Sequence, residues 1–248
     1  MTTNDKLCIF ALLLAIGPAL VHAADGSAAC FPPPSGLVSW WPGDSNENDI
    51  ADGNNPSAVS EVTLVPAEVL DGFTFGSNGY IEIPAASNLA NQRFTWAAWA
   101  KPQGSYKDQY GSVIVVQNSD TESDVIALDW RSSPNERFLF VFGDQRKETI
   151  YSAHTFPAGK FYHVAGTYDG KTFRLYVNVG LEASFQEIKT ISYTQNPWGF
   201  GESFISGIGS GFREWIGVID EVQAFKRPLS ASELTKIYKA GHRGECKK

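Results

Sequence analysis

Short apolar runs separated by turn residues make up most of this chain. Residues 94–100 (Phe-Thr-Trp-Ala-Ala-Trp-Ala) and residues 138–142 (Phe-Leu-Phe-Val-Phe) are apolar at nearly every position, which is typical of strands buried on both faces. Residues 80–83 alternate instead, so Ile81 and Ile83 fall on one face of a strand. Glycine, proline and asparagine recur between the runs, and this pattern predicts an all-β sandwich or barrel.

Two local signals predict a hairpin and a helix. Alternating runs flank Asp169-Gly170, and Asp-Gly in that setting predicts a tight hairpin whose two turn positions have positive φ. Ser230 and Glu233 have the spacing of a capping box, in which each side chain satisfies a backbone amide of the other residue. Apolar residues follow at helical spacing, so we expect one short C-terminal helix that ends near Gly241.

The first residues have the pattern of an export signal. Lys6 precedes an apolar run over residues 7–20, which is too short to span a bilayer comfortably, and Val21-His-Ala23 has the small-x-small pattern of a cleavage site. We therefore expect residues 1–23 to be a signal peptide and residues 24–248 to form a single secreted domain, extracellular or periplasmic. No second long apolar stretch follows, so we expect no membrane span.

The charge balance narrows the class of partner. The chain has 20 Lys and Arg against 27 Asp and Glu, a formal net charge of −7, and no basic cluster. Proteins that bind a nucleic-acid backbone need clustered positive charge, so we expect no nucleic-acid partner. The sequence leaves the oligomeric state undetermined.

A loop near the start is the best candidate for metal chemistry. Residues 44–55 (Asp-Ser-Asn-Glu-Asn-Asp-Ile-Ala-Asp-Gly-Asn-Asn) are rich in side-chain oxygens, and Gly53 allows a tight turn. Calcium prefers six to eight hard oxygen ligands, although the spacing here is not that of an EF-hand. The alternative is that these are ordinary turn residues, because Asp, Asn and Gly favour turns in any case.

Four segments together resemble the laminin-G-like family, which has the concanavalin A-like lectin/glucanase fold. They occur in family order at residues 36–44, 94–99, 161–177 and 217–234. The resemblance implies a two-sheet antiparallel jelly-roll sandwich with one short C-terminal helix, in which the first and last strands lie side by side. The fold hosts lectins, adhesion modules, glycosidases and lyases, so it does not imply a single function.

The same resemblance implies a position for a calcium ion. In the family, a carboxylate of the first loop and the aspartate of the closing strand often meet one calcium. Asp44 and Asp220 are therefore the first candidate ligands, with Asp49 next and Asn54 weaker. The ion would be structural, neutralising clustered carboxylates and fixing the loop to the last strand. Alternatively, Asp220 could accept a hydrogen bond from a backbone amide.

In the family, the first and last strands lie side by side, which would bring the cysteines near the two ends of the chain close together. Cys8 would leave with the signal peptide, and Cys30 and Cys246 would remain, one near each mature terminus. In an oxidising compartment we expect one disulfide between them, with two free thiols as the alternative. Such a bridge closes nearly the whole mature chain, and the chain-entropy account gives it about 5 kcal/mol.

The aromatic residues suggest carbohydrate binding, because aromatic faces stack on the apolar faces of sugars. Trp130, Trp198, Tyr106 and Tyr110 fall in or beside predicted loops, and we expect them to be the ligand-binding residues. The competing interpretation is that these rings only cover the edges of the sandwich.

Catalysis finds little support in the sequence. The Glu-x-Asp-x-x-Glu pattern of glycosidases with this fold is absent, because Val218 stands where its first glutamate should be. Asp220 and Glu221 alternate along a predicted strand, so we expect them not to share a site. Polysaccharide lyases of this fold need a Tyr/His pair. His163 and Tyr168 fall on opposite faces of another predicted strand, so they do not form such a pair.

We therefore expect a secreted, calcium-stabilised binding or adhesion module that recognises a glycan or an extracellular protein. The alternatives are a glycan-active hydrolase or lyase of this fold, and a purely structural component of the cell surface.

Overall fold

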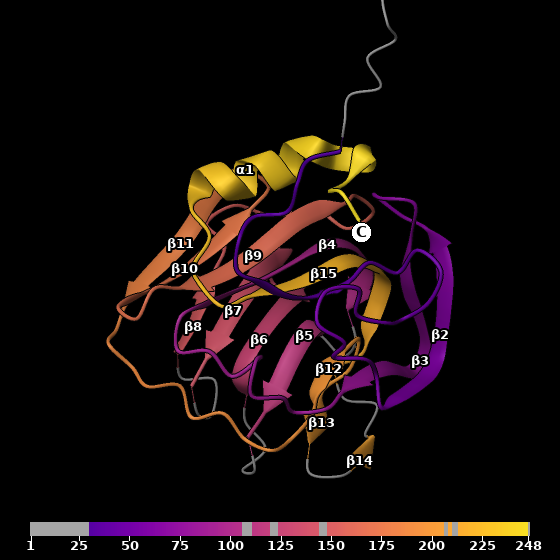
Figure 1. Cartoon of the computed structure of the whole chain (residues 1–248), viewed down its shortest axis with the longest axis horizontal. Coiled ribbons are helices and arrows are strands. Elements are labelled where there is room, and N and C mark those ends of the chain that lie inside the picture. The colour runs from indigo at the N-terminus through magenta and orange to yellow at the C-terminus, as the bar shows by residue number, and fades with distance from the viewer. Residues whose placement is uncertain are drawn as a thin grey trace, which may run out of the picture.

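The computed structural model describes residues 30–105, 111–119, 124–143, 148–205, 208–209 and 213–247 (Figure 1). The predicted signal peptide lies outside these residues, and so do two predicted ligand-binding residues, Tyr106 and Tyr110. Within the described ranges, no helix has the length and apolar character needed to cross a membrane.

Antiparallel strands build most of the molecule. The strands are β1 (Leu37–Trp41), β2 (Ala58–Pro66), β3 (Asp71–Ile83), β4 (Phe94–Ser105), β5 (Ser112–Asn118), β6 (Asp124–Arg131), β7 (Arg137–Phe142), β8 (Glu148–Tyr151), β9 (Tyr162–Tyr168), β10 (Thr172–Val177), β11 (Gly180–Gln186), β12 (Trp198–Phe200), β13 (Phe204–Ile205), β14 (Ile208–Gly209) and β15 (Trp215–Phe225). Helix α1 (Ala231–Ala240) and a 3₁₀ turn, η2 (Gly241–Arg243), follow the last strand.

A single ladder connects most strands in the order β11-β10-β9-β4-β15-β3-β12-β5-β6-β7-β8. β1 pairs with β15, β2 pairs with β3, and β13 and β14 pair with each other. β10 contacts β7 and β11 contacts β8, so the two ends of the ladder approach and the sheet is nearly closed. This confirms a mostly-β fold with a short C-terminal helix, whereas the division into two jelly-roll sheets stays a prediction.

The core lies inside this curled sheet and is rich in aromatic rings. Trp41 of β1 stacks on Trp96 of β4 with ring centroids 6.0 Å apart, and Trp96 in turn packs against Trp198 of β12. At the other end, Phe173 of β10 packs between Phe142 and Tyr168. The two predicted apolar runs are β4 and β7, and aromatic side chains of this size dominate the burial energy of a core.

The predicted hairpin is present between β9 and β10, with a turn that differs in detail. Gly170 has a φ of +90°, but Asp169 is not among the residues with positive φ. Instead, the Asp169 side chain accepts hydrogen bonds from the backbone amides of Lys171 and Thr172. The carboxylate therefore stabilises the turn in place of a second left-handed residue.

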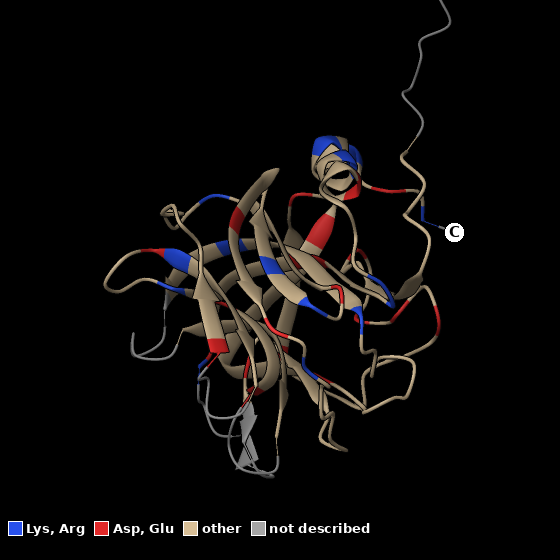
Figure 2. Ribbon diagram, turned by 90° about the vertical axis from the view of Figure 1, so that its left-hand side faces the viewer, with Lys and Arg blue, Asp and Glu red and all other residues tan. Residues whose placement is uncertain are grey.

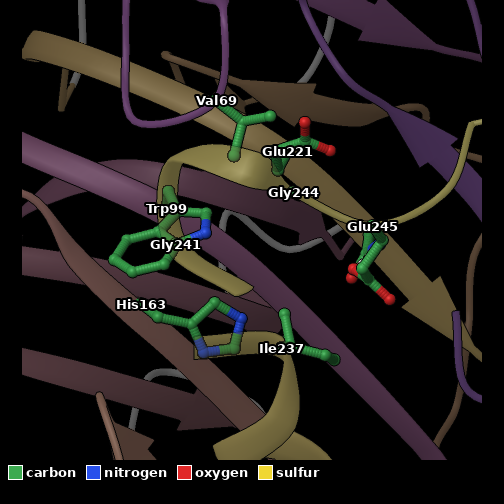
Figure 3. Close-up of a pocket in the computed structure, with 9 residues that line it drawn as sticks. Val69, Trp99, His163, Glu221, Ile237, Gly241, Gly244 and Glu245 are labelled. Atoms are coloured by element: carbon green, nitrogen blue, oxygen red, sulfur yellow. Dashed lines mark hydrogen bonds between the residues drawn. The ribbon is translucent and has the colours of Figure 1, made fainter. Parts of the chain in front are cut away.

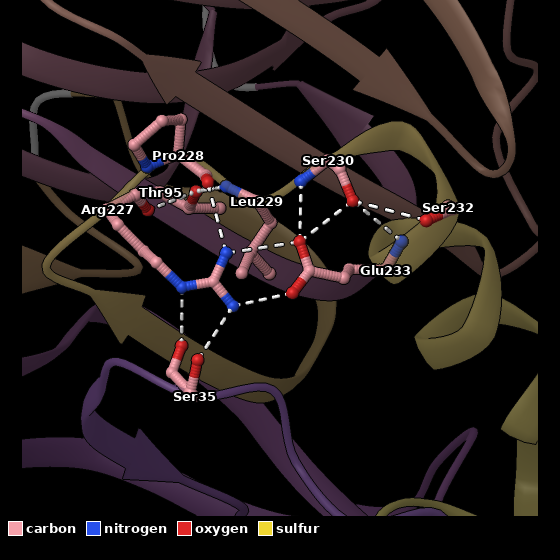
Figure 4. Close-up of polar contacts among 8 residues, drawn as sticks. All are labelled: Ser35, Thr95, Arg227, Pro228, Leu229, Ser230, Ser232 and Glu233. Carbon is pink, nitrogen blue, oxygen red and sulfur yellow. Dashed lines mark hydrogen bonds and ion pairs between the residues drawn. The ribbon is translucent and has the colours of Figure 1, made fainter.

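Helix α1 begins with the predicted capping box, which belongs to a larger network around Arg227 (Figure 4). The Arg227 guanidinium donates to both carboxylate oxygens of Glu233, at 3.1 and 2.5 Å, and to the backbone oxygen of Ser35, at 2.8 Å. The hydrogen bond from Arg227 is the main cause that lowers the pKa of Glu233 to about 2. One side chain thus joins the helix start to the segment that enters β1.

A disulfide joins the two ends of the described chain, as predicted. It links Cys30 and Cys246, which are separated by 216 residues. Beside it, Phe31 and Glu245 form an isolated bridge, and the Cys246 amide donates to the Phe31 carbonyl at 2.8 Å. The expectation that the first and last strands are neighbours is also confirmed, because β1 pairs with β15.

We predict that Arg227→Met lowers the free energy of unfolding by about 1–2 kcal/mol, which chemical denaturation can measure. The substitution removes charge-assisted hydrogen bonds to both Glu233 and the Ser35 segment, and the pair is only partly exposed. Arg174→Met is the matched control, because Arg174 and Asp169 form an ion pair of similar exposure that ties no second segment. An equal loss in both variants would show that the network around Arg227 adds nothing beyond an ordinary surface ion pair.

Candidate functional site

A bulge in β15 brings two consecutive carboxylates together. Asp220 pairs with Trp99 of β4, but the next paired residue on β15 is Gln223, opposite Ala97, and Glu221 has a φ of +52°. In a regular strand neighbouring side chains point to opposite faces, whereas a bulge redirects one of them. The prediction that the Asp220 and Glu221 carboxylates stay apart is therefore wrong: both are buried, the charge of Glu221 raises the pKa of Asp220, and Lys247 acts against the rise for both.

Lys247 directly follows Cys246 of the disulfide. Its ammonium lies 2.6 Å from Oδ2 of Asp44, in the loop after β1, and 2.5 Å from Oε1 of Glu221. The Nζ atom also lies 5.7 Å from the centre of the Trp40 ring. The other Glu221 oxygen accepts a hydrogen bond from the Trp40 indole. The ammonium of the residue after Cys246 thus contacts carboxylates from two other parts of the fold.

Asp220 lies deeper in the same cluster. Its Oδ2 atom accepts a hydrogen bond from the backbone amide of Val69 at 2.9 Å. Its Oδ1 atom is buried without a hydrogen-bond partner in the described residues, and the same holds for Oδ1 of Asp44. Buried polar atoms of this kind are rare in folded proteins and call for an explanation, such as a bound water, an ion or protonation.

A very small pocket beside the cluster contains further polar groups (Figure 3). Its volume is about 10 Å³, enough for a water molecule but too small for a sugar ring. Glu245 accepts a hydrogen bond from Gln223 at 2.7 Å, and its second carboxylate oxygen has no partner in the described chain. His163 packs edge-on against Trp99, and its Nδ1 atom is likewise buried without a partner in the described chain. The pocket therefore fits bound water rather than a substrate.

Burial is the largest cause of the pKa shifts of the acidic groups and of His163 in this region. It raises the pKa of Asp220 to about 9, with the charge of Glu221 adding to the effect. It also raises the pKa of Glu221 and of Glu245 to about 7, partly opposed by Lys247 for Glu221 and by Gln223 for Glu245. Burial lowers the pKa of His163 to about 4. For Lys247, burial alone would lower the pKa, but Glu221 and Asp44 outweigh it and the pKa lies above its usual value.

Two of the four predicted calcium ligands are occupied by other contacts. The Asp49 carboxylate accepts hydrogen bonds from backbone amides of its own loop and from that of Trp40, at 2.8 Å. The Asn54 side chain donates to Ser39, and its carbonyl accepts from the Trp41 indole. These are the contacts of turn residues, which is the alternative that the sequence left open. In the described part of the chain, no three His, Cys, Asp or Glu side chains form a group that could hold a metal.

The two predicted aromatic contacts that the structure describes are core residues. Trp130 is fully buried in β6 and donates its indole N–H to the carbonyl of Phe156 at 3.0 Å. Trp198 is only 1% exposed, at the start of β12, and packs on Trp96. Neither ring has a face for a ligand, so the prediction that they contact one is wrong. Both lie beside loops in the sequence, but each belongs to a strand that is buried along nearly its whole length.

An open hollow on the surface is a better place for a ligand. It has a volume of about 350 Å³ and lies between the loop after β3 and the loop before β12. Its lining contains no charged side chain and consists of Ala85, Ala86, Ser87, Ala90, Gln117, Tyr193, Thr194 and Gln195. Gln117 of β5 is 98% buried, and its Nε2 donates to the Asn196 carbonyl at 3.1 Å. Its Oε1 has no hydrogen-bond partner among the described residues.

Hydrogen bonds hold the two walls of this hollow together. The side-chain amide of Gln92 both donates to the carbonyl of Ile191, at 2.9 Å, and accepts from its amide, at 2.8 Å. The Tyr193 hydroxyl donates to the Asn91 carbonyl at 2.6 Å. The Thr194 hydroxyl in turn donates to the carbonyl of Asn118, the last residue of β5, at 3.0 Å. The walls are therefore fixed before any ligand binds, which lowers the entropy cost of binding.

Charged residues are scattered over the rest of the molecule. Figure 2 shows basic and acidic residues interspersed along the described ribbon rather than gathered into one basic field. Phosphate backbones are bound by clustered Lys and Arg, and the lack of a nucleic-acid partner stays a prediction from the sequence.

The Laminin_G_3 family, described as the concanavalin A-like lectin/glucanases superfamily, matches residues 75–235. This match covers more than half of the chain. The chain belongs to this superfamily. The family assignment confirms the resemblance found in the sequence. No curated protein matches the chain.

Solved structures that resemble this chain share its fold. Domain 4 of AbnA, a GH43 extracellular arabinanase from Geobacillus stearothermophilus in complex with arabinotriose, aligns over 80% of this chain and 96% of that domain, with a TM-score of 0.63 and 12% identity. Trypanosoma rangeli sialidase aligns over 85% of this chain but only 36% of its own, with a TM-score of 0.66 and 18% identity.

The binding domain of Paraclostridial Mosquitocidal Protein 1 aligns over 82% of this chain and 52% of its own, with a TM-score of 0.64 and 16% identity. The chain thus spans about a third of the sialidase and about half of the binding domain of the mosquitocidal protein. Identities this low establish a shared fold and nothing more about activity.

We predict that the melting temperature falls as the pH rises from 6.5 to 9, as measured by differential scanning calorimetry. The folded-state pKa values of Asp220, Glu221 and Glu245 lie above their usual values, so the folded state binds more protons than the unfolded state in this range. Their contribution to stability is complete below about pH 4 and is lost as the pH rises through 7 to 9. His163 has a lowered pKa and acts only at lower pH, so it does not disturb this window.

Glu245→Gln tests this prediction, because the amide mimics the protonated carboxyl and can still accept from Gln223. The variant should lose less stability than the wild type between pH 6.5 and 9. Glu61→Gln, at an exposed glutamate, is the control and should keep the wild-type slope. A Glu245→Gln slope as steep as that of the wild type would contradict the assignment.

Proposed function

We propose that this chain is an extracellular binding module that recognises a neutral oligosaccharide in the hollow lined by Gln117 and Tyr193. The observation that carries the proposal is Gln117, a side chain that lines the hollow and whose buried Oε1 atom has no hydrogen-bond partner in the described residues. A sugar hydroxyl is a suitable donor for such an atom, because an unmet buried acceptor costs free energy until it is satisfied.

The lining matches what a sugar presents. Alanine side chains and the Tyr193 ring offer apolar surface, while Ser87, Thr194 and Gln195 offer hydroxyl and amide groups at the rim. Binding sites commonly combine mostly apolar walls with a few placed polar groups, and a volume of about 350 Å³ is at the lower end of their range. A calcium ion plays no part here, since the lining has no carboxylate.

The absence of charge in the lining favours a neutral ligand. An acidic sugar needs Lys, Arg or a helix end beside it, and the lining residues supply none. The arabinanase domain was solved with arabinotriose, a neutral oligosaccharide, whereas the sialidase complexes contain sialic acid and related acids. Of these two ligand classes, the uncharged lining of this hollow favours the neutral oligosaccharide.

A hydrolase or lyase is the less favoured alternative. Glycosidases place two carboxyl groups on either side of the scissile bond, and none of the described lining residues is an acid. The buried carboxylates of β15 surround a pocket too small for a sugar. Secretion stays part of the proposal, supported by the disulfide between Cys30 and Cys246, which suits an oxidising compartment.

We predict that the chain binds a neutral oligosaccharide, with arabinotriose as the first probe in isothermal titration and a panel of immobilised neutral and acidic oligosaccharides beside it. Ala90→Leu should weaken binding at least tenfold, because the larger side chain enters the hollow at an exposed rim position. Gln117→Met should weaken it as well, because it removes the buried acceptor while keeping the length of the side chain.

Ala51→Leu is the matched control. Ala51 is also exposed and lines a second open hollow of similar size, about 320 Å³, near Trp40. This variant should bind like the wild type. Loss of binding in Ala51→Leu with none in Ala90→Leu would move the site to the second hollow, and binding of acidic sugars alone would overturn the proposal of a neutral ligand.

A further inference from the structure

We infer that the ammonium of Lys247 is the resident cation of the carboxylate cluster formed by Asp44, Asp220 and Glu221. It occupies the role that the sequence assigned to calcium, so the domain keeps its stability without a metal. The inference is independent of the proposed sugar site, which lies on other elements of the fold.

The first support is the position of the ammonium. It lies within 2.6 Å of one oxygen of Asp44 and 2.5 Å of one oxygen of Glu221, and it faces the Trp40 ring. The Lys247 side chain is 21% exposed, and that of Glu221 is 7% exposed. Charged groups withdrawn from water to this extent require a counter-charge, and an ammonium held by two carboxylates and an aromatic ring supplies it.

The second support is the poor fit to calcium. Calcium takes six to eight oxygen ligands, but Asp49 and Asn54 are committed to backbone and side-chain hydrogen bonds. Asp220 uses one oxygen to accept from the Val69 amide. Among the predicted ligands, the buried oxygens without a hydrogen-bond partner in the described residues are Oδ1 of Asp44 and Oδ1 of Asp220. Two such oxygens are too few for calcium.

The third support is the way the tail is held. The disulfide at Cys246 and the hydrogen bond from the Cys246 amide to the Phe31 carbonyl fix the backbone one residue before Lys247. An ammonium tethered so closely has a high effective concentration at the cluster, and ordering it costs little further entropy. A free metal ion would have to displace it from Asp44 and Glu221 in order to bind.

Thermal unfolding in excess calcium chloride and in EGTA tests the inference. The wild type should melt at the same temperature in both. Lys247→Met should melt several degrees lower than the wild type in both solutions, because the carboxylates have lost their counter-charge and the remaining oxygens are too few to bind calcium in its place. Lys247→Arg should stay near the wild type, and Lys239→Met, at an exposed lysine of α1, should show no loss and no response to calcium.

Two results would overturn the inference. A wild type stabilised by calcium and destabilised by EGTA would show that a metal is the resident cation. A Lys247→Met variant as stable as the wild type in EGTA would show that the ammonium contributes nothing.

A second measurement covers the case in which Lys247→Met does not fold. The wild type is treated with N-hydroxysuccinimidyl acetate, and acetylation of each lysine is followed by mass spectrometry. Lys247 should react several-fold more slowly than Lys239, with or without calcium, because its ammonium is held by Asp44 and Glu221. Equal rates, or a Lys247 rate that rises when calcium is added, would contradict the inference.

Discussion

Burying carboxylates inside a β-sheet costs free energy, and the contacts that offset this cost join separate parts of the fold to β15. β15 lies between β4 and β3, and its bulge places the carboxylates of Asp220 and Glu221 away from water. Isolated charges there would destabilise the sheet by several kcal/mol each. The amide of Val69, the indole of Trp40 and the ammonium of Lys247 each satisfy one part of this demand. The loop after β1 and the C-terminal tail are thereby fixed to the middle strand.

The two ends of the chain are held by different kinds of interaction at neighbouring places. A covalent bond joins Cys30 to Cys246, a guanidinium joins Ser35 to Glu233, and an ammonium joins the tail to Asp44. The proposed sugar hollow uses none of them, because its walls are held by Gln92, Tyr193 and Thr194. The contacts that hold the chain ends and those that hold the walls of the hollow are therefore separate sets, so a change in one is expected to leave the other largely intact.

The sequence was sufficient wherever a feature depends on neighbouring residues. The apolar runs of β4 and β7, the turn at Gly170 and the capping box at Ser230 are all local patterns, and the structure contains each of them. The family resemblance supplied the long-range pairing of β1 with β15, and with it the disulfide.

Features that depend on pairing between distant strands were not predicted. The bulge at Glu221 exists only in the register of β15 against β4, so its two carboxylates looked separated in the sequence. Trp130 and Trp198 looked like loop residues, because each stands next to turn-forming residues, yet each belongs to a buried strand. Gln117 gave no signal within the apolar run of β5, and Lys247 is a tail residue whose partner is revealed only by the path of the chain.

The place of β15 in the ladder has a consequence for how the chain reaches this structure. β15 follows all of its partner strands in the sequence, yet it pairs with β1, β3 and β4, and it separates strands that were made much earlier. Until it arrives, β3 and β4 have exposed edges in the middle of what will become one sheet. Folding must therefore wait for long-range pairings of high loop-closure cost, which makes it slow. Before β15 is made, the edges of β3 and β4 are open to pairing with other strands, so this stage of folding is the one most exposed to mispairing.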